Sequence, residues 1–161
     1  MKTDEKFIQA VSLIFSKHMP HNVIVGTVES IDKENDTCKV TRDDAPELFK
    51  VRLNAVIDNI TNKAVIYPAA GSKVLCTIIE NDTKEAAIIK YSEIESIIYK
   101  IGDTDYLINA TGYQIKRGNN NLKQLLNDFI AEVQKIIVVQ GTSPNVAALE
   151  EIKTKINLVL Q

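Results

Sequence analysis

The chain has 161 residues, of which 45% are hydrophobic and 25% are charged, and its formal net charge is −2. These values are typical of one globular domain, or of a small domain with an appendage. The length is sufficient to bury a core without the help of disulfides or bound metals. The near-neutral balance and the scattered basic residues argue against a nucleic-acid binder, which usually carries a basic excess or a basic face.

The first segment, residues 1–21, is predicted to contain a short helix over residues 4–18. Its apolar residues at helical spacing are Phe7, Val11, Ile14 and Phe15. Thr3 or Asp4 is expected to cap the helix and Pro20 to end it. This segment lacks the apolar core of a signal peptide, and no run in the chain approaches a membrane span. We therefore expect a protein kept in the cytoplasm, or in a particle assembled there.

The second segment, residues 22–92, changes to short runs with a period of two, separated by polar turns. The predicted strands are 22–31, 37–42, 47–53, 73–80 and 84–91. Residues 54–71 form a longer connection between the third and fourth strands. This count and grouping predict a five-stranded Greek-key barrel of the OB type, with a β-sandwich as the main rival. Gly26, in the middle of a strand, predicts a bulge or a sharp bend there.

Two side-chain predictions follow for the barrel interior. Alternation in the third strand places Phe49 inward together with Val51 and Leu53. Cys38 and Cys76 each stand alone in an apolar or alternating run, without the spacing of a zinc site. Such cysteines are usually small buried residues, although a disulfide between neighbouring strands is the alternative.

The third segment, residues 93–118, consists of three short runs divided by "GDTD" and "ATG", which predicts a β-meander. The apolar residues assigned to one face are Ile94, Ile98, Tyr106 and Ile108, and those assigned to the other are Ile97, Tyr99, Ile101 and Leu107. One face can cover the barrel. The other needs cover from the C-terminal helices of the same chain or from other copies, as in a cyclic trimer.

The last segment, residues 119–161, is predicted to be a helical hairpin. The asparagines of "GNNN" can cap a first helix over residues 122–137. Ser143 as cap and Pro144 at the first helical position are expected to open a second helix. The two apolar stripes comprise Leu122, Leu125, Leu126, Phe129, Val133 and Ile136, then Leu149, Ile152, Ile156 and Val159 or Leu160. Two helices joined by a short turn favour an antiparallel pair.

No residue pattern in the sequence assembles a catalytic or metal site. His18 and His21 form an HxxH across a proline without a glutamate partner, which favours exposed histidines at a helix end. Asp103 and Asp105 resemble the start of a calcium loop but lack its glycine and distant glutamate. We therefore expect a protein that is not an enzyme, with no cofactor, no metal and no small-molecule substrate.

An OB-type barrel also raises the hypothesis of a binding module for single-stranded nucleic acid or saccharide. Tyr67 and Tyr91 flank the loops and could stack on bases. Acidic residues that would repel phosphate are Glu29, Asp32, Glu34, Asp36, Asp43 and Asp44. Nucleic acid is thus the weaker expectation, and this module is the alternative function.

The order of parts resembles a class of phage proteins. A short helix precedes a barrel that opens with "VGTVESID", and "YPAAGSKVLCTIIE" is similar to the proline–glycine–small–polar–valine pattern before the fourth strand of baseplate and tail-spike barrels. The meander "SIIYKIGDTDYLINATGYQIKRG" and the helix "NLKQLLNDFIAEVQ" follow. Over residues 22–135 the chain resembles OB-fold hub and spike proteins of phage baseplates and contractile injection systems.

This resemblance implies a structural component of a phage tail or baseplate that associates with itself, for which a trimer is one arrangement, and with other tail or baseplate proteins. It would occupy the bacterial cytoplasm before assembly and then the virion tail or injection particle. The chain lacks the lysozyme domain, long β-prism and His-rich tip of some spikes, so it resembles a shortened hub or an accessory baseplate piece. The residues proposed for an interface are Ile98, Tyr106, Ile108, Leu122, Leu125, Phe129, Leu149, Ile152 and Ile156.

Overall fold

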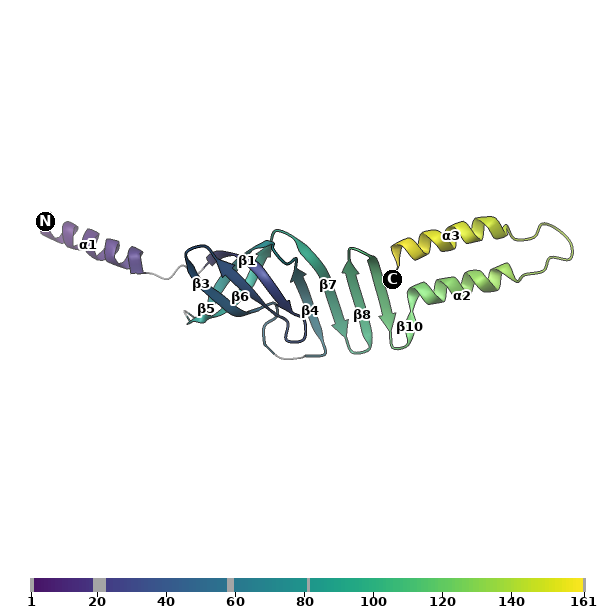
Figure 1. Cartoon of the computed structure of the whole chain (residues 1–161), viewed down its shortest axis with the longest axis horizontal. Coiled ribbons are helices and arrows are strands. Elements are labelled where there is room, and N and C mark those ends of the chain that lie inside the picture. The colour runs from purple at the N-terminus through teal and green to yellow at the C-terminus, as the bar shows by residue number, and fades with distance from the viewer. Residues whose placement is uncertain (1, 19–22, 58–59, 81, 161) are drawn as a thin grey trace.

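The computed structural model describes residues 2–18, 23–57, 60–80 and 82–160. A helix, a closed β-barrel, a second β-sheet and a helical hairpin follow one another along the long axis of the molecule (Figure 1). The predicted fold class, mainly β with a five-stranded OB-like barrel and flanking helices, is confirmed. Among the described residues no helix is long and apolar enough to cross a membrane.

The barrel consists of five short strands in the order β1-β2-β3-β6-β5. Their bounds are β1 Val23–Asp32, β2 Thr37–Arg42, β3 Ala45–Arg52, β5 Lys73–Ile79 and β6 Asp82–Tyr91. All five predicted strands are present. The buried core comprises Val28, Cys38, Val40, Leu48, Val51, Leu53, Val65, Tyr67, Val74, Cys76, Ala86 and Ile88. Most of these are β-branched or small residues, which fit the narrow interior of a five-stranded barrel.

Gly26 is required by close packing and not by a bulge. A Cβ at this position would lie 2.2 Å from Cγ1 of Val40 and 2.9 Å from the carbonyl oxygen of Thr41. The pairing with β5 runs regularly through Gly26, while the irregularity in β1 lies between Val28 and Ser30. The predicted bulge is therefore misplaced, and the glycine instead lets β2 approach β1 closely.

The prediction that Phe49 points inward is wrong. Its side chain is 62% exposed, whereas Leu48 and Val51 are both buried. Lys50 adopts a left-handed conformation with φ 54°. Val51 pairs with Cys38 and Leu48 pairs with Val40. Phe49 and Lys50 of β3 therefore lie together opposite the single residue Lys39 of β2. This bulge reverses the alternation and turns Phe49 to the outside of the barrel.

Part of the predicted connection over residues 54–71 is instead a strand, β4 Lys63–Pro68. It opens a second sheet with the order β10-β9-β8-β7-β4. The other members are β7 Ile94–Ile101, β8 Thr104–Asn109, β9 Gly112–Arg117 and β10 Asn120–Asn121. The predicted β-meander is thus present as β7, β8 and β9. The sequence pattern did not predict β4, because its partner strand, β7, lies about thirty residues later in the chain.

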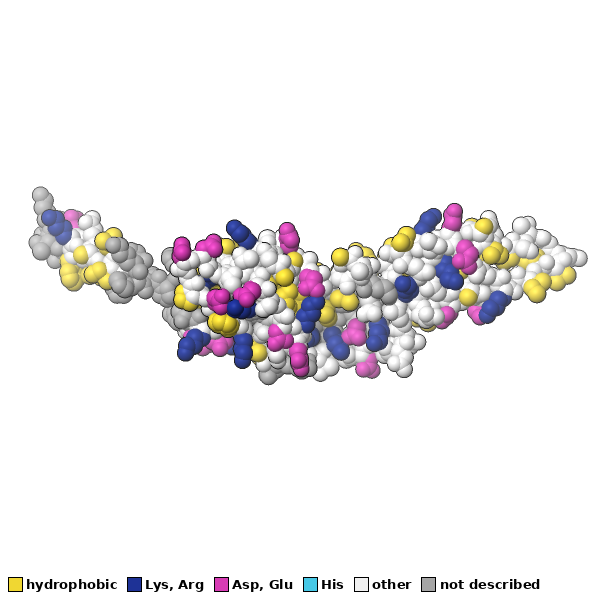
Figure 2. Space-filling view, viewed as in Figure 1, with side chains coloured by type: hydrophobic (Ala, Val, Ile, Leu, Met, Phe, Trp, Pro, Cys, Tyr) yellow, Lys and Arg dark blue, Asp and Glu magenta, His cyan; other side chains and the backbone are white. Residues whose placement is uncertain are grey.

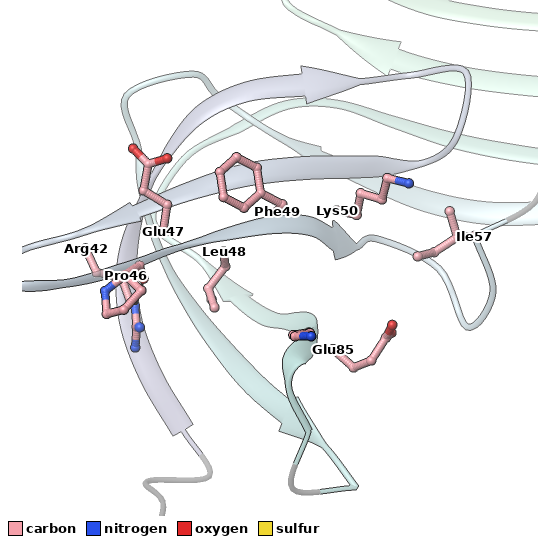
Figure 3. Close-up of a pocket in the computed structure, with 9 residues that line it drawn as sticks. Arg42, Pro46, Glu47, Leu48, Phe49, Lys50, Ile57 and Glu85 are labelled. Atoms are coloured by element: carbon pink, nitrogen blue, oxygen red, sulfur yellow. Dashed lines mark hydrogen bonds between the residues drawn. The ribbon is translucent and has the colours of Figure 1, made fainter.

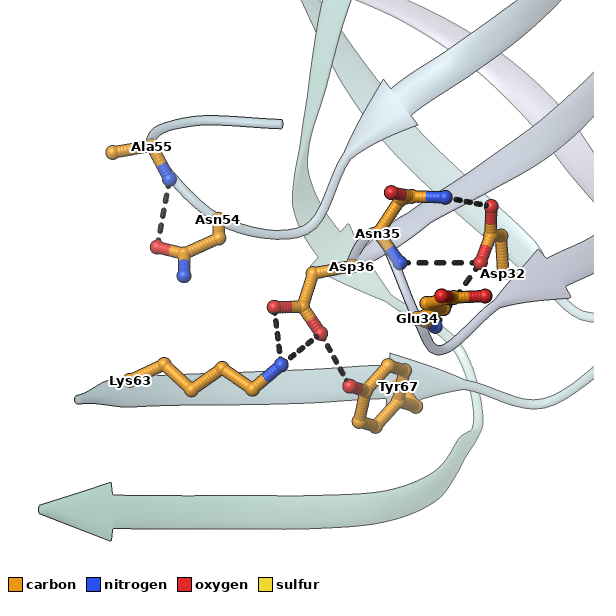
Figure 4. Close-up of polar contacts among 8 residues, drawn as sticks. All are labelled: Asp32, Glu34, Asn35, Asp36, Asn54, Ala55, Lys63 and Tyr67. Carbon is orange, nitrogen blue, oxygen red and sulfur yellow. Dashed lines mark hydrogen bonds and ion pairs between the residues drawn. The ribbon is translucent and has the colours of Figure 1, made fainter. Parts of the chain in front are cut away.

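A buried carboxylate joins the second sheet to the barrel (Figure 4). Asp36, in the turn between β1 and β2, is fully buried. Nζ of Lys63 in β4 donates to both of its carboxylate oxygens, at 2.8 and 2.6 Å, and the hydroxyl of Tyr67 donates to one of them. The carboxylate thus has three donated hydrogen bonds, as a buried charge requires.

The N-terminal helix α1 spans Lys2–His18. It begins before Thr3 and Asp4, so neither residue is the cap that was predicted; both lie in its first turn. Pro20, the predicted stop, lies outside the described residues. Phe7 and Ile8 are 70% and 65% exposed.

The C-terminal helices α2 Leu122–Gln134 and α3 Val146–Val159 form the predicted antiparallel hairpin (Figure 1). Asn121 caps α2, accepting a hydrogen bond from the amide of Lys123 at 2.8 Å. Asn145 caps α3, so the prediction of Ser143 as cap and Pro144 as first helical residue is wrong. The asparagine side chain reaches the amide of Ala148 three residues on, and the helix starts only after it.

Candidate interaction surface

One face of the second sheet is a continuous array of apolar side chains. Residues directly opposite each other in neighbouring strands share a face, so the pairing registers define rows across β4, β7, β8 and β9. The first row is Ala64, Tyr99, Tyr106 and Ile115, and the second is Ile66, Ile97, Ile108 and Tyr113. Ile101 extends the array along β7. These nine residues form the apolar sheet face.

The register corrects the predicted assignment of the meander to two faces. Tyr106 lies opposite Tyr99, and Ile108 opposite Ile97, so these four residues share one face. Ile98 lies opposite Leu107 on the other face and packs against the barrel core. Grouping Ile98 with Tyr106 and Ile108 was wrong, because residues of a β-hairpin share a face according to the turn register and not according to their spacing in the sequence.

The apolar sheet face is largely open to solvent in the single chain. Tyr99 is 49% exposed, Ile101 72%, Tyr113 43% and Ile115 40%. At roughly 200 Å² for a full large side chain, these four alone leave about 400 Å² of side-chain surface uncovered. An exposed apolar patch of that size typically marks an interaction surface.

The nine residues of this face include no Asp, Glu, Lys, Arg or His, and Tyr99 and Tyr106 lie with ring centroids 6.2 Å apart. One charged residue borders them on the same face: Arg117 lies opposite Thr104, which pairs with Ile101. Lys100 and Asp105 belong to the opposite face, where Nζ of Lys100 lies 3.8 Å from Oδ1 of Asp105. The apolar sheet face is therefore free of acidic and basic side chains except at its Arg117 end.

The helical hairpin does not cover this face. It meets the sheet at the β9 and β10 edge, where Leu160 bridges to Tyr113, and it projects away from the sheet (Figure 1). Within the hairpin, Ile130 is buried, Asn127 hydrogen-bonds Asn157, and Gln134 hydrogen-bonds Glu150. The alternative of cover by the hairpin of the same chain is thus not what the structure shows.

The hairpin has exposed apolar positions of its own. On α2, Leu125 is 51% and Phe129 66% exposed, and on α3, Ile152 is 48% exposed. The remaining helical residues predicted for an interface, Leu122, Leu149 and Ile156, are partly buried. Of the sheet residues predicted, Tyr106 and Ile108 lie on the apolar sheet face, partly covered by their neighbours, and Ile98 does not.

Charges elsewhere on the molecule do not gather into a patch of one sign. Figure 2 shows acidic and basic side chains interspersed over the barrel and the hairpin. Several are paired across strands: Lys39 with both Glu29 and Glu47, Arg52 with Glu85, and Lys33 with Glu95. The hydrogen bonds that Lys39 donates to Glu29 and Glu47 raise the pKa of Lys39.

The two cysteines are free and buried in the barrel core. Burial raises the pKa of Cys38 to about 12 and that of Cys76 to about 11. The thiolate, which is the reactive form, is therefore scarce at neutral pH. The structure favours small buried residues over the disulfide.

Within the described ranges no group of three His, Cys, Asp or Glu could hold a metal ion. His21 and the side chain of His18 lie outside what the structure describes. The prediction that Tyr67 could stack on a base is wrong, since it is 1% exposed and donates to Asp36. Tyr91 is partly buried, and this burial raises its pKa.

No protein-family model, curated protein or solved structure matches this chain. A functional inference therefore rests on the surface of the molecule itself, above all on the apolar sheet face.

Proposed function

We propose that this protein is a non-enzymatic structural subunit of a phage tail or baseplate, a hub- or spike-like adaptor that assembles with copies of itself. The observation that carries this proposal is the apolar sheet face, an uncharged and exposed surface beside a closed barrel. The closed barrel has its own buried core, so it suits a rigid adaptor. The sheet then supplies the contact.

Identical copies fit this face for an electrostatic reason. A surface that meets its own copy brings each charge close to the same charge, which is costly unless the pattern is self-complementary. The nine residues of the apolar sheet face carry no charge, and Arg117 lies at the end of this face, where it can stay in solvent when two or three copies pack together. A cyclic trimer would bury the sheet faces around a common axis.

The exposed apolar area of the single chain also supports self-association. A stable interface takes roughly 800 Å² from each partner. The four most exposed residues of the sheet face supply about half of that by the estimate of roughly 200 Å² per side chain. Exposed apolar residues of the hairpin, among them Leu125 and Phe129, can supply more.

The alternative, a barrel that binds single-stranded nucleic acid or saccharide, has less support. Of the two tyrosines that could have stacked on bases, Tyr67 is buried. Two basic residues of the barrel, Lys39 and Arg52, are engaged with carboxylates. A phosphate-binding surface normally offers unpaired cations along a groove.

The assembly is tested by light scattering coupled to size-exclusion chromatography. We expect a mass that is a multiple of the 17.9 kDa chain. The double variant Tyr99→Glu/Ile115→Glu places two charges on the apolar sheet face and is expected to give the monomer mass, because burying unpaired carboxylates is costly. Circular dichroism checks that the variant keeps its strands.

The matched control is Gln114→Glu, on the same strand as Ile115 but on the opposite face. It is expected to keep the wild-type mass. A wild-type protein that is strictly monomeric at high concentration would overturn the proposal, and so would a double variant that keeps the assembled mass.

Membership of a tail or baseplate is tested separately, by the genes that flank this one in its genome. Neighbours that encode tail proteins are expected. A setting among metabolic genes would contradict the tail assignment while leaving the self-association intact.

A further inference from the structure

A groove of about 680 Å³ lies on the outside of the barrel between β3 and β6, away from the apolar sheet face (Figure 3). Its wall is formed by Pro46, Leu48, Phe49 and Ile57 on one side and by Lys84 and Glu85 on the other. The volume is within the range of protein ligand sites. Phe49 contributes an exposed aromatic ring, a residue type that often anchors a partner.

The strands that border the groove are hardly paired with each other. In the described part of the chain, β3 and β6 pair at one position, Arg52 with Ala87. The stretch of β3 before Arg52 and the stretch of β6 before Ala87 diverge from there. The carbonyl of Pro46 accepts a hydrogen bond from Nε of Arg42 at 2.9 Å, so an added strand would use the other backbone groups of these two edges.

Charge in the groove is unevenly distributed. Its two carboxylates are engaged: Glu47 with Lys39 at 3.0 Å, and Glu85 with Arg52. Lys50 and Lys84 line the same groove, and neither makes an ion pair with any residue that the structure describes. The groove thus presents the ammonium group of Lys84 and that of Lys50, which also acts on the carboxylate of Asp32, beside an apolar wall that Arg42 borders.

The backbone at Lys50 is an independent sign that this surface is used. A left-handed conformation costs a non-glycine residue about 1 kcal/mol or more, and such strain is concentrated at binding sites. Here it turns Phe49 into the groove at 62% exposure and leaves Leu48 and Val51 to fill the core.

We propose that this groove binds an extended acidic segment of a partner protein, which adds as a β-strand between β3 and β6. Carboxylates of the segment would pair with Lys50 and Lys84, and its small apolar side chains would contact Phe49 and Pro46. This partner is distinct from the second copy that meets the apolar sheet face, so the inference does not depend on the proposed assembly.

A single-stranded nucleic acid fits the groove less well. Nζ of Lys39 lies 5.2 Å from the centroid of the Phe49 ring, so one face of the ring is occupied by an ammonium group and not free for a base.

The probe is a fluorescein-labelled peptide of alternating glutamate and valine, about six residues long to span roughly 20 Å of strand. We expect its fluorescence anisotropy to rise on titration with the protein. The variant Lys50→Glu/Lys84→Glu is expected to weaken binding at least about tenfold through like-charge repulsion. Phe49→Ala is expected to weaken it several-fold while leaving thermal unfolding nearly unchanged, because the ring is exposed.

The matched control is Lys90→Glu, an exposed lysine on β6 that does not line the groove, and it is expected to bind like the wild type. Tyr99→Glu/Ile115→Glu is also expected to bind the peptide normally, which separates this site from self-association. The inference is overturned if the acidic peptide does not bind, or if Lys50→Glu/Lys84→Glu has no effect. It is equally overturned if a lysine–valine peptide or an oligothymidylate binds as tightly.

Discussion

Lys50 shows how one backbone conformation redirects the side chains of a whole strand. Its positive φ inserts an extra residue into β3, so Leu48 and Val51 both reach the core and Phe49 reaches solvent. The cost of the left-handed lysine is compensated by burial of two large aliphatic side chains. Without the bulge, Phe49 would have to fit inside a barrel whose interior is filled by valines and cysteines.

The buried thiols and Tyr67 predict a loss of stability at alkaline pH. Burial raises the pKa of Cys38 to about 12 and of Cys76 to about 11, and burial together with the bond to Asp36 raises that of Tyr67. The folded state therefore holds protons that the unfolded state releases near pH 8.5 for thiols and pH 10 for tyrosine. The stabilisation from these protonated groups is fully present below the pKa values of the unfolded chain. It declines as the pH rises above them.

Urea unfolding monitored at pH 7, 9 and 10 is expected to show this decline, by roughly 1 to 2 kcal/mol per thiol at pH 10. The double variant Cys38→Ala/Cys76→Ala, although less stable at pH 7, is expected to have a shallower pH dependence. Equal slopes for the two proteins would show that the thiols are not protected in the fold.

At the scale of elements, β4 connects the two sheets. Val65 and Tyr67 on one face of β4 contribute to the barrel core, while Ala64 and Ile66 on the other begin the apolar sheet face. Asp36 binds β4 from the barrel side through Lys63 and Tyr67. One short strand and one buried charge therefore help to fix the sheet against the barrel, together with Ile98 and the Lys33–Glu95 ion pair.

The variant Asp36→Asn tests this link. Asparagine tolerates the left-handed conformation of Asp36, at φ 51°, but removes the charge that pairs with Lys63, whose side chain is 11% exposed. We expect a loss of about 3 kcal/mol in unfolding free energy, because a nearly buried ammonium group is left unpaired.

Urea denaturation measures this loss, with Asp43→Asn in an exposed turn as the control that should change stability by less than about 0.5 kcal/mol. Replacing Lys63 by Met in the Asp36→Asn background is expected to restore part of the stability. Failure of that second change to help would mean that the penalty does not come from the unpaired lysine.

At the scale of the whole molecule, four parts in a row leave much apolar surface without intramolecular cover. The barrel buries its own core, but the sheet beyond it has one face on water, and the hairpin contacts only the far edge of that sheet (Figure 1). A single-layer sheet with an apolar face is stable when a second layer packs on it. The proposed assembly supplies that layer.

Because the proposed interface is uncharged, its stability is expected to be insensitive to added sodium chloride. Salt at about 1 M screens ionic contacts strongly but does not weaken apolar burial. Light scattering at low and at high salt should give the same assembled mass, and ammonium sulfate should favour assembly further. Dissociation on adding sodium chloride would indicate an interface made of ion pairs instead of the apolar sheet face.

Local patterns were enough to predict the parts of this chain. The period of two with polar turns predicted the five barrel strands, the three-strand meander and their order along the chain, and the helical spacing predicted both C-terminal helices. The asparagines of "GNNN" were predicted to cap the first of these helices, and one of them, Asn121, does. These features depend on residues close together in the sequence, such as turn residues and alternating side chains, so they can be read without the fold.

Other features were decided only by contacts between distant segments. β4 forms because β7 pairs with it, Phe49 turns outward because β2 imposes a bulge, and Asp36 is buried because Lys63 and Tyr67 reach it. The grouping of Tyr106 and Ile108 with Tyr99 and Ile97 likewise depends on the register between strands. A shift of one residue would move each side chain to the other face, and only pairing in three dimensions determines that register.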